Sequence, residues 1–400
     1  MKPSPAVHRS TMRSDLDELI MNRRTLVCVG PGGVGKTTTS AAIGVRAATL
    51  GRKTLVLTID PAHRLANALG LSSFEHEQQR IADALFADAD LKNTAPLHAM
   101  MLDTRRTFDE VVRRYAGDPE VQARILESPF YEQASTRLAG SQEYMAMEKL
   151  YELAQTREFD LIVLDTPPTM HALDFLDAPD RLEAFMSQST EGITAASTKL
   201  LSSLGLSFMK ANAMILQGIG KFLGTQLFLD ILAFLGDFRS MYIGFRERAQ
   251  AVKAMMRSDD VGFLVLSSAE PSSVSEGLYF AEQLTNETMP VAGYILNRVR
   301  RQMSDQKAGM DEETARSLAQ ALAASGTTVD DTEELLRKLE LCLRQANEIA
   351  ARDVGQTVRV RKAVPVVPLL AVPDFEEDIH DLRGLYRYGQ HLASVNGSGE

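Results

Sequence analysis

The chain has 400 residues, 44% of them hydrophobic and 24% charged, a composition typical of a globular protein of two or three domains. It carries 43 Lys and Arg against 53 Asp and Glu, and this net charge of −10 disfavours sequence-independent nucleic-acid binding, which requires neutralised phosphates. Two cysteines, Cys28 and Cys342, are too few for a disulfide framework or for a cysteine zinc site within one chain.

Short apolar runs alternate with helical patterns along most of the chain. A continuous apolar run indicates a strand buried on both faces, as in a parallel sheet covered by helices. The sequence therefore predicts an α/β fold, doubly wound around a mainly parallel sheet. The expected strands are 25–29, 53–59, 97–102, 160–164, 261–266, 291–296 and 364–369.

Two segments interrupt this alternation and are predicted to be helical insertions. Residues 181–252 lack a strand pattern, and between Leu200 and Gly236 22 of 37 residues are apolar, far above the average of the chain. Residues 300–362 are polar and rich in Ala, Glu, Leu and Arg. The N-terminal stretch lacks a signal-peptide pattern, and no window offers 18 uncharged apolar residues, so we expect a cytoplasmic protein.

A glycine-rich segment, GPGGVGKT at 30–37, follows the first expected strand and begins a helix. It satisfies both the dinucleotide pattern G-x-G-x-x-G and the P-loop pattern G-x-x-x-x-G-K-[ST]. Lys36 decides for the P-loop, because a triphosphate needs a cation at its β- and γ-phosphates. Backbone N–H groups would surround the phosphates, and the Thr37 hydroxyl would ligate Mg²⁺. The predicted nucleotide-binding residues here are Gly30, Pro31, Gly32, Gly33, Val34, Gly35, Lys36, Thr37 and Thr38.

A P-loop site also requires an acidic residue at the end of another buried strand. Asp165 follows the apolar run Leu161–Leu164 and would hold Mg²⁺ through a water molecule. The alternative interpretation is an ordinary strand that ends in a helix-capping aspartate.

Three motifs occur together: the P-loop, DPAH at 60–63 and DTPPTMH at 165–171. This combination resembles the ArsA family of P-loop ATPases, which includes the arsenical-pump ATPase and the ATPase that guides tail-anchored proteins to membranes. The resemblance extends from Leu26 to the C-terminus and covers the order of both insertions. It implies an enzyme that requires ATP and Mg²⁺, hydrolyses ATP to ADP and phosphate, and dimerises.

The resemblance also implies roles for single residues. Asp60 would position or activate the attacking water, or in the alternative serve only the turn after its strand. Asn297, at the end of the expected strand 291–296, would read the adenine, and Glu270 would lie near the nucleotide. The segment 165–171 would sense the γ-phosphate, and we assign no chemistry to His171.

The chain departs from the family at two places. Pro31 stands where the family usually has a Lys that crosses the dimer interface to the phosphates of the partner. Either a neighbouring cation such as Arg64 replaces that Lys, or a paralogous chain supplies it in a heterodimer; we favour the second. Cys28 and Cys342 provide neither the zinc site of the targeting factor nor the metalloid thiols of the arsenite pump, so we expect no zinc.

The leading hypothesis is a nucleotide-driven dimer switch, a homodimer or a heterodimer, that binds a hydrophobic client or membrane partner through residues 200–236. The alternative is that this segment is core. An arsenite or anion pump subunit ranks second, and a MinD- or ParA-like spatial organiser third. A partner would place the protein peripherally at a membrane. The expected division is an N-terminal extension (1–22), an ATPase core (23–180, 253–299 and 363–395), an apolar insertion (181–252) and a polar insertion (300–362).

Overall fold

The structure is a computed structural model that describes residues 15–59, 64–71, 77–92, 94–128, 131, 141–166, 237, 242–302, 312–324, 332–379 and 381–394. The apolar segment from Leu200 to Gly236 lies outside the described residues, and so does most of the predicted insertion 181–252. None of the described helices is long and apolar enough to cross a membrane.

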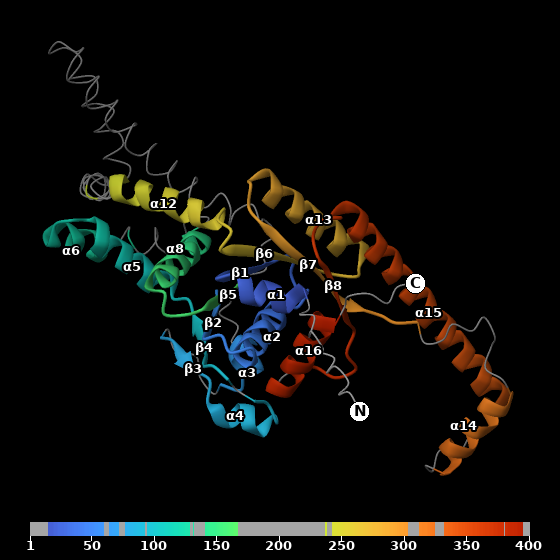
Figure 1. Ribbon diagram of the computed structural model, residues 1–400. Helices are drawn as coiled ribbons and strands as arrows, with labels where there is room; N and C mark the ends of the chain where they lie inside the picture. The colour runs from blue at the N-terminus through green and yellow to red at the C-terminus, as the bar shows by residue number, and fades with distance from the viewer. Residues whose placement is uncertain are drawn as a thin grey trace, which may run out of the picture.

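A single sheet of eight strands forms the centre of the molecule (Figure 1). The strand order is β3-β4-β2-β5-β1-β6-β7-β8, and every neighbouring pair is parallel except β3 and β4. This confirms the predicted α/β fold with a mainly parallel sheet. The strands are β1 (Thr25–Val29), β2 (Thr54–Thr58), β3 (Gln79–Arg80), β4 (Leu97–Met101), β5 (Leu161–Asp165), β6 (Val261–Ser268), β7 (Val291–Val299) and β8 (Leu369–Pro373).

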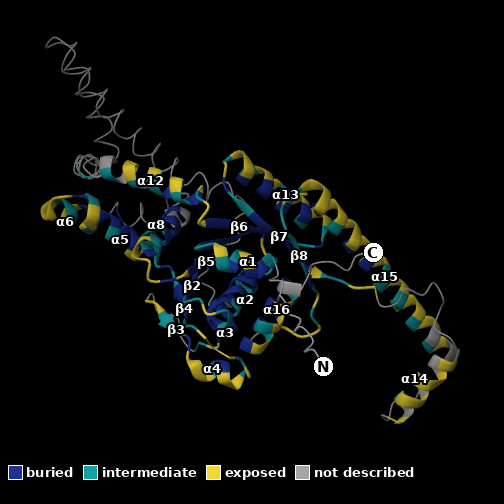
Figure 2. Ribbon diagram, viewed as in Figure 1, coloured by how far each residue is buried: buried dark blue, intermediate teal, exposed yellow. Residues whose placement is uncertain are grey.

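Helices cover both faces of this sheet, as its buried strands require (Figure 2). Along β1, Val27 and Val29 contribute to one hydrophobic cluster while Leu26 and Cys28 contribute to the other, because successive side chains of a strand point to opposite faces. The helices are α1 (Asp15–Asn22), α2 (Lys36–Thr49), α3 (Arg64–Ala68), α4 (Asp83–Asp88), α5 (Thr104–Tyr115), α6 (Pro119–Glu127), α8 (Ser141–Thr156), α12 (Tyr242–Met256), α13 (Pro271–Asn286), α14 (Glu312–Ala324), α15 (Thr332–Ala363) and α16 (Leu382–Ser394).

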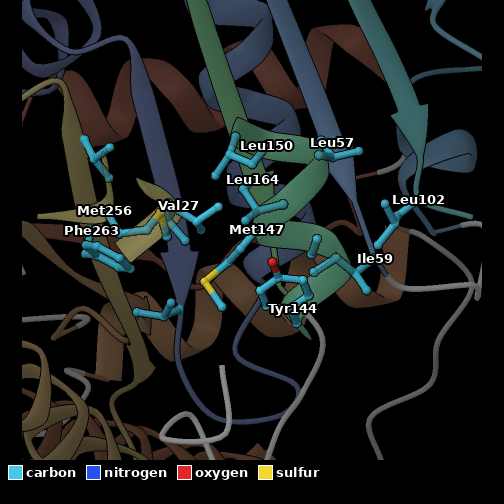
Figure 3. Packing of buried hydrophobic residues seen from close by; sticks show 14 of the residues in the cluster. Val27, Leu57, Ile59, Leu102, Tyr144, Met147, Leu150, Leu164, Met256 and Phe263 are labelled. Carbon is cyan, nitrogen blue, oxygen red and sulfur yellow. The ribbon is translucent and has the colours of Figure 1, made fainter. Parts of the chain in front are cut away.

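The face covered by α8 shows how the helices attach (Figure 3). Tyr144, Met147 and Leu150 of α8 are buried in one cluster with Leu57 of β2 and Leu164 of β5. Helix α8 leads into β5, so this packing fixes the strand that ends at Asp165. On the opposite face, α2 packs against α16 and α1.

An alternating series of charges ties α5, α8 and α12 together. At its buried end, the Arg248 side chain of α12 donates to both carboxylate oxygens of Glu148 in α8, at 2.9 and 3.0 Å. Glu148 is only 1% exposed. The series therefore ties α12 to α8, and through α8 to the face of the sheet that α8 covers. Its members in order are Glu77, Arg106, Glu110, Lys149, Glu152, Arg114, Glu148 and Arg248.

The last strand was predicted at the wrong place. The expected strand 364–369 is a turn over most of its length, and β8 begins only at Leu369. Pro365 and Pro368 lack the N–H group that a ladder hydrogen bond requires, so an apolar run alone misplaces the strand. The two-residue strand β3, which pairs antiparallel at the edge, carries no apolar run and was not predicted.

Two further elements bear on the expected division of the chain. Residues 15–22, at the end of the expected N-terminal extension, form α1, whose Leu16 and Ile20 are fully buried and whose Asp17 pairs with Arg46 at 2.8 Å. In the polar insertion, the C-terminal part of α15 lies beside α13 and contacts β7 and β8, whereas α14 and the N-terminal part extend away from the sheet (Figure 1).

Candidate functional site: the phosphate loop and its neighbours

The glycine-rich loop lies at the point of the sheet where the chain changes direction. Strand β1 lies between β5 and β6. Strands β2, β4 and β3 lie beyond β5, and β7 and β8 lie beyond β6, so the chain builds the sheet first on one side of β1 and then on the other. In open α/β sheets, ligands bind outside the carboxyl ends of the strands at such a switch point. The loop connects the carboxyl end of β1 to the N-terminus of α2, so it occupies this position.

Two of the loop glycines are required by their surroundings. Gly30 has φ +150°, and a Cβ there would lie 2.2 Å from the carbonyl oxygen of Leu266 in β6. Gly35 has φ +91° and would place a Cβ 2.5 Å from the amide nitrogen of Asn297. Both glycines let the loop approach the neighbouring strands closely. The loop ends at the N-terminus of α2, whose first-turn N–H groups have no partner within the helix and lie at the carboxyl ends of the strands.

The Lys36 side chain folds back over this loop. Its ammonium group donates to the carbonyl oxygens of Gly30 and Pro31, at 2.8 and 2.9 Å, and the residue is 5% exposed. The cation is therefore already held inside the loop, beside the N-terminus of α2. A polyphosphate in this cradle would meet the ammonium group and backbone N–H groups, which matches the charge of such a ligand.

Asp165, the predicted acidic partner, lies in hydrogen-bond contact with the loop. Its Oδ2 accepts a bond from the Thr37 hydroxyl at 2.8 Å and a second from the Thr58 hydroxyl at 2.9 Å. The parallel register explains the meeting, because Asp165 pairs with Cys28 of β1 and with Thr58 of β2. The sequence analysis did not predict a role for Thr58, although a hydroxyl side chain at the end of a buried apolar strand could have indicated one.

These oxygen donors fit Mg²⁺. No group of three or more His, Cys, Asp or Glu residues suited to a metal ion occurs in the part of the chain that the structure describes. Mg²⁺ does not need such a group, since it keeps several waters and uses one or two protein oxygens together with substrate phosphates. Thr37 and Asp165 together offer a hydroxyl and a carboxylate at the edge of the phosphate cradle.

Asn297 lies beside the loop, where its amide braces the backbone. Its Nδ2 donates to the Val34 carbonyl at 2.8 Å, its Oδ1 accepts from the backbone N–H of Arg298 at 3.0 Å, and the residue is 5% exposed. The sequence predicted a contact with adenine for this residue. The bond to Val34 uses one N–H of the amide, and the second N–H could still donate to a base. The adenine contact stays a prediction.

Glu270 precedes α13 at the same edge, directly after β6. Its side chain is about half exposed and pairs with Arg352 of α15 at 3.0 Å and with Arg300 at 3.4 Å. Its proximity to a nucleotide stays a prediction, whereas its contacts with α15 are visible in the structure.

The buried environment behind the loop is chemically quiet. Burial raises the pKa of the Cys28 thiol to about 12, so this residue packs as a small neutral side chain. The Thr39 hydroxyl of α2 lies 2.8 Å from the hydroxyl of Tyr388 in α16, and Thr166 donates to the Cys28 carbonyl. None of these bonds was predicted from the sequence.

Several predicted residues lie outside the described part. These are His171 and Asp60, the residue predicted to act on the attacking water. Arg64 is the first residue of α3, but its side chain is not among the described ones. Pro31 is buried in the loop, and its carbonyl accepts from Lys36.

Comparison with known families agrees with this geometry. The family model of the anion-transporting ATPases, ArsA_ATPase, matches residues 23–322. The chain belongs to the ArsA family of ATPases. The resemblance drawn from the three sequence motifs is thereby confirmed, and the P-loop between β1 and α2 is that of an ArsA-family nucleotide-binding fold.

Individual ArsA-family relatives are similar over different spans. The chain is 29% identical over 178 residues to the ATPase GET3 of Malassezia globosa, covering 44% of this chain and 48% of that protein. It is 31% identical over 207 residues to an ATPase ASNA1 homolog of Babesia bovis, covering 50% and 52%. It therefore spans about half the length of these two relatives. The ATPase get3 of Aspergillus terreus is 24% identical over 306 residues, which is 75% of this chain and 81% of that protein.

Proposed function

We propose that this chain binds ATP and Mg²⁺ at residues 30–38 and hydrolyses ATP to ADP and phosphate. The observation that carries the proposal is the meeting of Lys36, Thr37 and Asp165 at the carboxyl ends of β1 and β5. A buried ammonium group, a hydroxyl and a carboxylate at the mouth of a backbone cradle are the parts that phosphoryl transfer requires. Family membership and the names of the relatives support the same activity.

Each residue has a defined task in this proposal. Lys36 exchanges its two carbonyl contacts for the β- and γ-phosphates, and the N–H groups of α2 hold the remaining phosphate oxygens. Thr37 and Asp165 would hold Mg²⁺, the aspartate through water, and the bound metal neutralises charge on the phosphates. Asp60 orients the attacking water, and Asn297 reads the adenine edge.

Calorimetric titration of ATP with Mg²⁺ tests the binding step. Lys36→Ala should weaken binding by at least a hundredfold, because it removes the cation from the cradle. Lys53→Ala, which removes a lysine after α2 whose side chain is 34% exposed, is the matched control and should bind ATP as the parent chain does. Unchanged affinity in Lys36→Ala would refute the proposal.

Asp60→Asn tests the hydrolytic step separately. We expect it to bind ATP normally and to lose 10²- to 10⁴-fold in rate, the usual contribution of a positioned general base. A loss below about threefold would assign Asp60 to the turn after its strand.

Preference for ATP over GTP tests Asn297, and Asn297→Ala should reduce that preference.

We further propose that nucleotide binding drives a dimer, a homodimer or a heterodimer, that handles a hydrophobic client or membrane partner. The apolar composition of 200–236 and the ArsA-family resemblance to the ATPase that guides tail-anchored proteins support this role. In the proposed organisation, this segment belongs to an insertion at 181–252 and α14 and α15 to another at 300–362. A cytoplasmic protein, peripheral at a membrane through its partner, fits the role. Crosslinking of Asp60→Asn in ATP, followed by identification of the captured chain, tests it: a protein with an apolar helix supports the proposal, and capture of none refutes it.

Pro31 bears on the composition of that dimer. If a paralogous chain supplies the missing interfacial cation, the chain alone should hydrolyse ATP slowly, and Pro31→Lys should raise the rate. If Arg64 serves instead, Arg64→Ala should abolish the activity of the lone chain.

An anion pump subunit is the second candidate function, because the matching family model carries that description. Stimulation of ATP hydrolysis by arsenite would favour it.

A further inference from the structure

Strand β7 ends in an irregularity beside the phosphate loop. Its register with β8 shifts between Leu296 and Val299, and Arg298, between them, has φ +57°. Of the other described non-glycine residues with positive φ, Asp90, Arg157 and Thr288, each follows the end of a helix, where such a conformation is usual. Arg298 adopts it inside a strand. Bulges of this kind occur next to active sites, where they redirect a side chain.

The irregularity contains Asn297 and Arg298, two neighbouring residues at the end of β7. The Asn297 side chain passes under the loop to Val34 and accepts the backbone N–H of Arg298. Arg298 itself is exposed. Its charge acts on Tyr388, whose hydroxyl bonds Thr39 in the first turns of α2: burial raises the pKa of Tyr388, and the Arg298 guanidinium opposes that rise. Because Asn297 contacts Val34 of the loop, the backbone of Arg298, the next residue, lies beside the phosphate loop.

Arg298 is distinguished from its neighbour Arg300 by its lack of a carboxylate. Arg300 lies within 3.9 Å of the carboxylates of Glu270, Asp353 and Asp374. No carboxylate in the described ranges forms an ion pair with Arg298. Arg298 is thus an exposed arginine in a costly backbone conformation, next to the residue that contacts the phosphate loop.

We propose that the Arg298 guanidinium stacks on the purine base of the bound nucleotide. This inference rests on the proposed ATP binding. Strands β1 and β7 are separated by β6, so their ends lie roughly 10 Å apart at the usual strand spacing. The proposed adenine contact of Asn297, the neighbour of Arg298, would place the base of a nucleotide whose phosphates lie over β1 on the β7 side. A planar guanidinium stacks on aromatic faces and tolerates any purine, so Arg298 raises affinity, whereas Asn297 distinguishes bases.

The variant Arg298→Gly tests this assignment without endangering the fold. Glycine adopts positive φ readily, so the variant keeps the backbone and loses only the side chain. We expect its affinity for ATP and for GTP to fall about tenfold, with an unchanged melting temperature. Its affinity for inorganic tripolyphosphate, which has no base, should equal that of the parent chain. Arg298→Lys keeps the charge without the plane and should recover only part of the loss.

Arg301→Ala, which removes another exposed arginine three residues further on, is the matched control and should bind ATP as the parent chain does. Equal losses of ATP and tripolyphosphate affinity in Arg298→Gly would assign Arg298 to the phosphates and overturn the proposal. Unchanged ATP affinity in that variant would overturn it as well, while leaving the proposed function intact. Failure of the parent chain to bind ATP at all would overturn both.

Discussion

The hydroxyl of Thr58 offers a sharp test of the metal site, because it donates to Asp165 although Thr58 is not part of the P-loop motif. Asp165 Oδ2 accepts two hydroxyl bonds, from Thr37 at 2.8 Å and from Thr58 at 2.9 Å. The first donor is itself a proposed metal ligand, so Thr58 would continue to orient the carboxylate when Thr37 turns to the metal. Thr58→Val keeps the shape of the fully buried side chain and removes this bond.

The size of the effect follows from the bond that is lost. A hydrogen bond to a charged group contributes about 1.5–3 kcal/mol, and loss of an outer partner of a metal ligand typically lowers metal affinity by about 10- to 100-fold. We expect Thr58→Val to raise the Mg²⁺ concentration for half-maximal ATP hydrolysis by at least tenfold, with the maximal rate less affected. The assay is a Mg²⁺ titration at fixed ATP.

Thr58→Ser is the matched control, because serine keeps the hydroxyl and loses only a methyl group. It should require nearly the same Mg²⁺ concentration as the parent chain. If Thr58→Val stays within twofold of the parent chain while it remains folded, Asp165 does not depend on Thr58 for its orientation, and the proposed geometry of the metal site is incorrect.

Three further predictions follow from buried groups. Since burial raises the pKa of Cys28 to about 12, an alkylating reagent at pH 8 should label exposed Cys342 quickly and Cys28 only in denaturant; mass spectrometry that finds both labelled in the native chain would contradict this. Glu148→Gln leaves the Arg248 guanidinium without its counter-charge and should lower the free energy of unfolding by about 3 kcal/mol, measured in urea; a loss below 1 kcal/mol would show that the pair contributes no more than a surface pair. Burial lowers the pKa of His98 below its usual 6.5, so the unfolded chain binds more protons than the folded one as the pH falls through 6.5. Stability should therefore decline between pH 7.5 and 5.5, and His98→Gln should make that decline smaller.

The central strands and the loop could be predicted because their signals are local. The continuous apolar runs of β1, β2 and β5 mark strands buried on both faces, and the observed bounds lie within one residue of the predicted ones. The lysine and threonine of the loop predict a triphosphate site without any knowledge of the neighbouring strands. The meeting of Thr37 with Asp165 follows from the motif, since parallel strands bring their carboxyl ends to one edge.

Contacts that depend on register were beyond prediction. The bond from Asn297 to Val34 joins residues 263 positions apart, and it requires β7 to pair with β6 in the register that sets Asn297 opposite Ser268. The Glu148–Arg248 pair depends on how α8 and α12 pack, because each residue taken alone is an ordinary charged position on a helix. Neither contact leaves a periodic or compositional pattern in the sequence.

The end of β7 connects the phosphate loop to the long helix α15. Four consecutive residues take part. The Asn297 amide donates to the loop, Arg298 donates its backbone N–H to Asn297, Val299 accepts from Asp374 after β8, and Arg300 donates its backbone N–H to buried Asp353 in α15. A shift of the loop on nucleotide binding would therefore act on α15 through backbone that is hydrogen-bonded at nearly every residue. Because α15 extends away from the sheet with α14, a small rotation where it meets β7 would become a larger displacement at its far end (Figure 1). These contacts from the loop through β7 to α15 could transmit the proposed ATP-driven change from the nucleotide site to α14.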